Sequence, residues 1–203
     1  MSRLDLVVGP NGAGKTSFIA TVLAPALPMS AIVNADQIAA IRWPGAEVEH
    51  AYDAARIAGR TRSALIRTSL PFIAETVFSH ESELTLIDDA HRAGYDVALH
   101  VLMVPVDLAV ERVQHRVAAG GHAVPEQKIR ERYARLWPLV AAAATRCDTT
   151  RVWDNAHLHG PGLVASLESG RLVGTATWPA WAAPELSRRW PDGDQRTQRR
   201  PTT

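Results

Sequence analysis

A glycine-rich segment close to the start of the chain has the residue types and the spacing of a phosphate-binding loop. The pattern G-x-x-x-x-G-K-[ST] is met by Gly9, Gly14, Lys15 and Thr16. In such a loop the glycines let the backbone curl, so that several N–H groups point at phosphate oxygens at the positive end of the next helix. We therefore predict an ATP site. Its nucleotide-binding residues are Gly9, Pro10, Asn11, Gly12, Ala13, Gly14, Lys15, Thr16 and Ser17.

Two side chains of this loop have separate tasks in phosphoryl transfer. Lys15 is expected to reach the β- and γ-phosphates as a catalytic residue, and the Thr16 hydroxyl is the expected ligand of Mg²⁺. The chain has only two lysines, Lys15 and Lys128, so a lysine at this position of the loop is hard to explain by chance. ATP and Mg²⁺ are the predicted cofactors.

An aspartate follows the second predicted strand, which covers residues 31–33. In an open parallel sheet, ligands sit at the carboxyl ends of the strands, so Asp36 is expected near the phosphates. Its carboxylate could accept the proton of an attacking hydroxyl or help to hold magnesium, and it could instead cap a helix that starts at Gln37. We predict Asp36 as a catalytic and substrate-binding residue.

Glu75 and Thr76 end the third predicted strand, over 71–77, on the same edge of the sheet. A carboxylate beside a hydroxyl suits the vicinal hydroxyls of a sugar, and the alternative is a simple strand-end turn. We predict both as substrate-binding residues. The likewise polar pair Asp154-Asn155, after a late strand, could contact the nucleotide or form a turn, and Asp88-Asp89 is interpreted as the solvent face of a helix.

Arginines surround the glycine pair Gly120-Gly121. Guanidinium groups that close over a nucleotide neutralise charge on the transferred phosphoryl group, and glycines allow such a lid to move. The alternative is a solvated helix face. We predict a lid over residues 112–132. Its candidate residues are the catalytic Arg112, Arg116 and Arg132, with Arg130 as the alternative to Arg132, and the substrate-binding His122.

Strands alternate with helices over most of the chain, which predicts an α/β fold of the P-loop kinase type, a parallel sheet with helices on both faces. The predicted strands cover 3–8, 31–33, 71–77, 95–104 and 151–153, and the helices cover 15–23, 49–69, 81–93, 106–118 and 126–146. We expect a kinase domain over 1–159 and a C-terminal extension over 160–203, where 184–203 is expected to be loosely ordered.

The composition narrows the class of protein. The 203 residues carry a net charge of +1, so the chain has no general attraction to polyanions, and we expect no nucleic-acid partner. No long apolar run predicts a membrane span, and no leader segment is recognised at the N-terminus. The single Cys147 cannot form an internal disulfide and is interpreted as a small helix-face residue. We expect a soluble, cytoplasmic protein.

The ordered combination of these motifs resembles the zeta-toxin kinases of toxin–antitoxin systems, in particular their short single-domain relatives. The resemblance extends from about residue 4 to 155. It is carried by Gly-Pro-Asn-Gly-Ala-Gly-Lys-Thr at 9–16, Asn-Ala-Asp at 34–36, Glu-Thr-Val-Phe-Ser at 75–79, Gly-Tyr at 94–95, Arg-Val-Ala-Ala-Gly-Gly-His-Ala-Val-Pro at 116–125 and Asp-Asn at 154–155.

This resemblance implies an ATP-dependent kinase that phosphorylates the 3′-hydroxyl of the amino sugar in UDP-N-acetylglucosamine and is paired with a small antitoxin protein. It implies that Asp36 is the base and that Glu75 and Thr76 bind the substrate. His122 stands where longer relatives carry an arginine, and Val77-Phe78 stands where a threonine and a leucine are usual. The alternatives are a kinase of an NAD ribose hydroxyl or of a housekeeping metabolite, and a non-catalytic nucleotide-binding module. A regulatory GTPase is disfavoured because neither lysine follows an asparagine.

Overall fold

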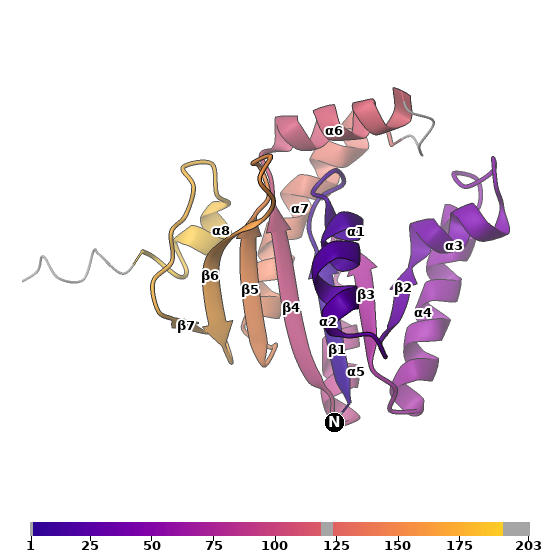
Figure 1. Ribbon diagram of the computed structural model, residues 1–203, viewed down its shortest axis with the longest axis horizontal. Helices are drawn as coiled ribbons and strands as arrows, with labels where there is room; N and C mark the ends of the chain where they lie inside the picture. The colour runs from indigo at the N-terminus through magenta and orange to yellow at the C-terminus, as the bar shows by residue number, and fades with distance from the viewer. Residues whose placement is uncertain (1, 119–123, 193–203) are drawn as a thin grey trace, which may run out of the picture.

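One seven-stranded sheet forms the centre of the computed structural model, which describes residues 2–118 and 124–192 (Figure 1). The strand order within these ranges is β2-β3-β1-β4-β5-β6-β7. The strands are β1 Arg3–Val8, β2 Ala31–Asn34, β3 Phe72–Thr76, β4 Asp96–Met103, β5 Thr149–Asp154, β6 Gly162–Glu168 and β7 Arg171–Val173.

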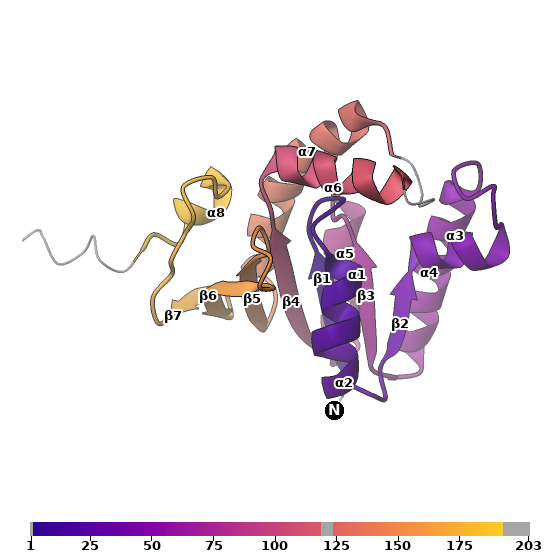
Figure 2. The same cartoon turned by 45° about the horizontal axis from the view of Figure 1, so that its top comes forward.

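The helices connect the parallel strands and cover both faces of the sheet (Figure 2). They are α1 Lys15–Phe18, η1 Ile19–Leu23, α2 Ala24–Ala26, α3 Ala35–Arg42, α4 Ala51–Arg67, α5 Ser82–Arg92, α6 Val106–Ala118, α7 Glu126–Ala144 and α8 Pro184–Ser187. The predicted P-loop kinase architecture is confirmed, and the short helix α3 is an addition to the elements expected from the sequence.

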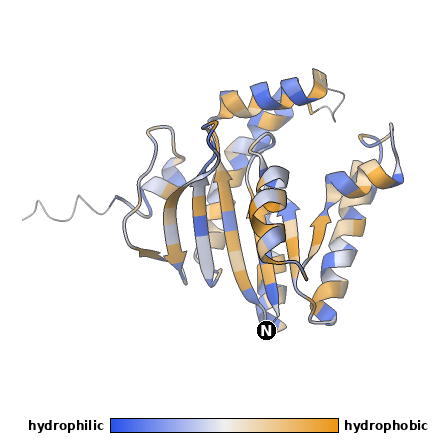
Figure 3. Ribbon diagram, in the orientation of Figure 1, coloured by the Kyte–Doolittle hydropathy of each residue, from blue (hydrophilic) through white to orange (hydrophobic). Residues whose placement is uncertain are grey.

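Alternate residues of each central strand point into two separate apolar cores. Leu4 and Leu6 of β1 pack on the face covered by α4, α5 and α7. Val7 packs on the opposite face with Phe18 and Ile19 of the P-loop helix. Because both faces are covered, β1 is a nearly continuous apolar run, and Figure 3 shows the same concentration of hydrophobic residues along the central strands.

Two C-terminal strands extend the sheet beyond the strands predicted from the sequence. Strands β1 to β5 are parallel, but β6 pairs antiparallel with β5, and β7 pairs antiparallel with β6. The connection over 155–161 is too short for a crossover helix, which a parallel neighbour would need, so the chain turns back. The predicted strands thus form the parallel part of the sheet, and β6 and β7 add an antiparallel edge that the sequence did not predict.

The residues after 184 are packed as far as the structure describes them. Leu186 of α8 and Trp190 are buried in the larger core, and the Trp190 indole donates a hydrogen bond to the Gly170 carbonyl at 2.9 Å. The expectation of a loosely ordered tail from residue 184 was wrong for 184–192. The segment is polar overall, but its apolar residues Leu186 and Trp190 anchor it to the core. Residues 193–203 lie outside the described residues. No helix in the described ranges is long and apolar enough to cross a bilayer.

Candidate functional site

The glycine-rich loop lies between β1 and α1 at the carboxyl edge of the sheet, as its motif requires. Gly12 has φ +79°, and a Cβ atom there would lie 2.4 Å from the carbonyl oxygen of Ala109 in α6. Only glycine allows the loop to approach α6 this closely. The loop backbone is further closed by a hydrogen bond from the Ala13 N–H to the Pro10 carbonyl at 3.1 Å.

Lys15 is buried inside the curl of this loop. Its Nζ donates hydrogen bonds to the carbonyl oxygens of Gly9 and Pro10, both at 3.0 Å. Burial lowers the pKa of the Lys15 ammonium, the charges of Arg116 and Arg132 act in the same direction, and the carboxylates of Glu75 and Asp36 oppose them. The two neutral carbonyl oxygens stabilise the Lys15 ammonium less than a negatively charged group would. A bound polyphosphate would supply such a group.

The Thr16 hydroxyl is hydrogen-bonded to the carboxylate of Glu75. The Thr16 hydroxyl contacts Oε1 and Oε2 of Glu75 at 3.0 and 3.1 Å, and the Asn34 side-chain amide donates to Oε2 at 2.6 Å. This arrangement follows from the parallel register of β1 and β3, which pairs Val7 with Glu75. Glu75 therefore lies beside the predicted magnesium ligand.

A hydroxyl and a carboxylate are oxygen donors of the kind that Mg²⁺ prefers, so Thr16 and Glu75 fit this ion. The described residues contain no group of three or more His, Cys, Asp or Glu side chains that could hold a metal by themselves. Mg²⁺ in phosphotransferases usually takes its remaining ligands from water and from substrate phosphates.

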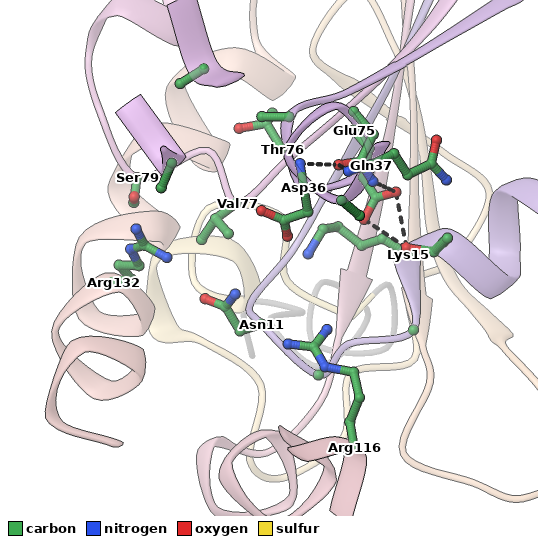
Figure 4. A pocket seen from close by; sticks show the side chains of 18 of the residues that line it. Asn11, Lys15, Asp36, Gln37, Glu75, Thr76, Val77, Ser79, Arg116 and Arg132 are labelled. Atoms are coloured by element: carbon green, nitrogen blue, oxygen red, sulfur yellow. Dashed lines mark hydrogen bonds between the residues drawn. The ribbon is translucent and has the colours of Figure 1, made fainter. Parts of the chain in front are cut away.

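Asp36 lies in the first turn of α3, but it does not cap this helix. The cap is Asn34, whose Oδ1 accepts hydrogen bonds from the backbone N–H groups of Asp36 and Gln37 at 2.7 and 3.3 Å. The capping alternative for Asp36 was therefore wrong. Because Asn34 performs this task, the Asp36 carboxylate can line the cleft, where Figure 4 shows it opposite Lys15 and Arg116.

A cleft of about 640 Å³ joins the P-loop to α3, α4, the segment after β3 and the helices α6 and α7. It brings together most of the residues that the sequence predicts, and Figure 4 shows Arg116 and Arg132 entering it from two different helices. The predicted residues that line it are Asn11, Gly12, Gly14, Lys15, Thr16, Ser17, Asp36, Glu75, Thr76, Arg112, Arg116 and Arg132.

Some predicted residues do not line this cleft. Gly9, Pro10 and Ala13 belong to the loop behind it. Arg130 is held outside by ion pairs with Asp107 and Glu126, both at 2.9 Å, so only Arg132 of this pair lines the cleft. His122 lies outside the described residues.

Thr76 is engaged with the protein itself. Its hydroxyl donates to Oε1 of Glu83 at 2.7 Å and accepts from the Phe78 N–H at 3.1 Å. Phe78 has φ +60° and is buried, so the chain bends sharply after β3 and places Val77 and Ser79 at the cleft. The prediction for Thr76 thus concerns a hydroxyl that already has two partners.

Sequence reasoning missed several residues of the cleft. Glu83 in the first turn of α5 lines it and also pairs with Arg62 at 3.4 Å. No motif marks Glu83, because its distance from Thr76 depends on the bend at Phe78. The other missed lining residues are Asn34, Ala35, Gln37, Ala40, Ala51, Ala55, Val77 and Ser79.

Two polar pairs from the sequence have different positions. Asp88 forms an ion pair with Arg146 at 3.1 Å, and Asp89 pairs with Arg92 on the exposed side of α5, so their interpretation as a solvent face is confirmed. Asp154 ends β5 at the same edge of the sheet as the P-loop, and Asn155, the next residue, contacts that loop directly.

A comparison with family models matches residues 4–139 to a family described as AAA domain. None of the curated proteins with which the sequence was compared matches it significantly. The matched range includes the P-loop, β3, α6 and most of α7, so it covers every residue that lines the cleft.

Solved structures resemble this fold at low sequence identity. The AvrRxo1-ORF1:-ORF2 complex with ATP matches with a TM-score of 0.69 and 18% identity, over 85% of this chain and 60% of that chain. The PezAT chromosomal toxin–antitoxin system of Streptococcus pneumoniae matches with a TM-score of 0.61 and 12% identity, over 93% and 84%. A putative kinase from Chloroflexus aurantiacus has a TM-score of 0.52 and 18% identity, over 66% and 79%.

Proposed function

This chain belongs to the AAA domain family of P-loop proteins, and we propose that it is an ATP-dependent kinase that phosphorylates a sugar hydroxyl. The observation that carries the proposal is the meeting of opposite charges across one cleft. Lys15, Arg116 and Arg132 line the same cleft as the Asp36 carboxylate (Figure 4), and this arrangement supports a triphosphate site with a base beside it. A proposed kinase domain over 1–159 with its lid at 112–132 contains all of these residues.

In the proposed reaction the chain's own residues bind and orient the two reactants. The P-loop N–H groups and Lys15 bind the β- and γ-phosphates, and the lid arginines bind oxygens of the transferred group. Mg²⁺, when held by Thr16 with Glu75 beside it, neutralises charge on the phosphates. Asp36 accepts the proton of the attacking hydroxyl while the new O–P bond forms and ADP leaves.

The acceptor that we propose is UDP-N-acetylglucosamine or a related UDP-sugar. It is supported by the resemblance to zeta-toxin kinases and by the carboxylates of Asp36 and Glu83, which suit sugar hydroxyls. We further propose that the protein is the toxin of a toxin–antitoxin pair with a small antitoxin partner. PezAT is described as such a system, and its fold is similar.

The activity of the larger relatives does not transfer directly, because the chain spans only 60% of the matched AvrRxo1 structures. The proposed acceptor therefore needs a direct test. The protein is incubated with limiting ATP, Mg²⁺ and equal concentrations of UDP-N-acetylglucosamine and NAD, and the products are identified by mass spectrometry. We expect the UDP-sugar to gain the mass of one phosphate.

The matched control for this assay is Lys15→Ala, which removes a phosphate-directed charge from the loop and should abolish transfer while the circular dichroism spectrum stays unchanged. Labelling of NAD alone would overturn the UDP-sugar acceptor and preserve the kinase. Labelling of neither would overturn both acceptors and favour a kinase of a housekeeping metabolite or a non-catalytic module. Full activity of a folded Lys15→Ala protein would refute the proposed kinase site.

A further inference from the structure

Asn155 forms hydrogen bonds with three separate parts of the site, and the proposed reaction gives it no role so far. It follows β5 directly, and its backbone N–H donates to the carbonyl of Met103, the last residue of β4, at 2.9 Å. This bond fixes the backbone of Asn155 to the edge of the sheet. Its side chain and its carbonyl then reach two different elements of the site.

The side chain of Asn155 is hydrogen-bonded to the backbone of the P-loop. Its Nδ2 donates to the Ala13 carbonyl at 2.7 Å. Gly14 has φ +82°, and a Cβ atom there would lie 2.6 Å from the same Nδ2, so the amide occupies space that only glycine leaves. Because a trans peptide is planar, fixing the Ala13 carbonyl also fixes the direction of the Gly14 N–H, one of the groups expected to meet phosphate.

The backbone carbonyl of Asn155 contacts the predicted lid through helix α6. It accepts a hydrogen bond from Nη1 of Arg112 at 2.9 Å, and Arg112 projects from α6 into the cleft. A guanidinium group is a rigid planar fork, so holding one nitrogen orients the others. The same residue is thus bonded to the phosphate-binding loop on one side and to the lid helix on the other.

We propose that Asn155 is a positioning residue that couples the P-loop to the lid helix α6. When the loop takes up ATP, the Ala13 peptide and Asn155 become more firmly placed, and this holds Arg112 toward the nucleotide. By thermodynamic reciprocity, the Arg112 contact must in turn strengthen ATP binding. The inference rests on the proposed ATP site and adds a residue that acts through its neighbours.

The test uses the binding of a non-hydrolysable ATP analogue with Mg²⁺, measured by calorimetry, so that it needs no acceptor. Asn155→Ala removes the bond to Ala13, and we expect roughly tenfold weaker binding. Asn155→Asp should bind more weakly still, because a carboxylate cannot donate to the Ala13 carbonyl and adds negative charge near the phosphates. Arg92→Met, which changes an arginine of α5 that pairs with Asp89 outside the cleft, is the control and should bind as the wild type does.

Coupling is tested by combining Asn155→Ala with Arg112→Met. If Asn155 transmits the contact, the Arg112→Met change weakens binding by a smaller factor in the Asn155→Ala background than in the wild type. Hydrogen exchange gives a second measurement. The analogue should slow exchange in α6 of the wild type, and Asn155→Ala should lose this protection while the P-loop amides keep part of theirs.

Two outcomes overturn the coupling. One is strictly independent effects of the two changes, and the other is unchanged protection of α6 in Asn155→Ala. If Asn155→Ala fails to fold, Arg112→Met alone must weaken binding and speed exchange at Ala13 and Gly14, or the inference is wrong. Failure of the wild-type protein to bind the analogue would instead refute the ATP site itself, and with it both proposals.

Discussion

The clearest disagreement between motif and geometry concerns Glu75, and Glu75→Gln distinguishes its two possible roles. The sequence predicts that this carboxylate binds the acceptor, whereas the structure places it on Thr16, the predicted magnesium ligand. Gln has the same shape and can present its oxygen to the Asn34 amide, which donates to Glu75 at 2.6 Å. The fold should therefore survive the change.

The expected size of the effect follows from the lost charge. Hydrogen bonds to a charged acceptor contribute about 1.5–3 kcal/mol and those to a neutral one about 0.5–1.5 kcal/mol, so each contact of Glu75 weakens by about 1 kcal/mol or more. A change in the outer shell of a metal site typically lowers its affinity by about 10–100-fold. We expect the Mg²⁺ concentration for half-maximal activity to rise by about this factor, with much of kcat restored at saturating Mg²⁺.

The assay is a magnesium titration of the initial rate at fixed ATP and acceptor, followed by an acceptor titration at saturating Mg²⁺. Glu83→Gln is the matched control, because it changes a cleft carboxylate bonded to Thr76 and Arg62 rather than to Thr16. Its magnesium dependence should stay as in the wild type. An increased acceptor KM with an unchanged magnesium titration in Glu75→Gln would refute the metal role and restore the substrate-binding prediction.

The remaining predictions concern the base, the lid, a buried charge network and the cysteine. Asp36→Asn should keep ATP affinity and lose most of kcat, since the amide cannot accept the hydroxyl proton, and a wild-type rate would exclude Asp36 as the base. The lid prediction is tested by single alanine variants of Arg112, Arg116, Arg130 and Arg132. An arginine that contacts the transferred phosphoryl group should lose about 10³-fold in kcat, whereas a solvated one should change little. Uniformly small losses would argue against a catalytic lid. Burial tends to raise the pKa of Asp5, but hydrogen bonds from Arg3 and His100 outweigh it and hold the pKa below its ordinary value. The ionised Asp5 therefore stabilises the fold above about pH 4, and this contribution is lost as the pH falls further. As the pH falls below about 4, Asp5→Asn should lose less free energy of unfolding than the wild type. Burial raises the pKa of the Cys147 thiol, so a thiol reagent at pH 8 should modify it only when denaturant is added, and rapid labelling of the native protein would contradict the burial.

The local parts of the site could be predicted from the sequence because their chemistry depends on adjacent residues. The P-loop needs glycines, a lysine and a threonine at fixed spacing between a strand and a helix, and all of these lie within one short segment. The alternation of strands and helices likewise indicated the parallel half of the sheet, because crossover connections need helices. The roles of Lys15, Thr16 and Asp36 in catalysis stay predictions.

Contacts between distant segments could not be predicted, because they depend on strand order and helix placement. Glu75 meets Thr16 only because β3 lies next to β1, and no local pattern states that order. Arg130 and Arg132 are two positions apart on α7, so the helical twist points them in different directions, but only the placement of α7 brings one to Asp107 and the other to the cleft.

The C-terminal region shows the same limit for the fold. The strand β6 lacks a simple alternation, and its antiparallel pairing with β5 depends on the short connection over 155–161. Trp190 finds its partner at Gly170 through tertiary packing alone. The sequence by itself determined a P-loop that binds phosphate between a strand and a helix, whereas the partners of Glu75, Arg132 and Asn155 were decided only when the sheet brought separate segments to one edge, because hydrogen bonds and ion pairs require atoms within a few ångströms.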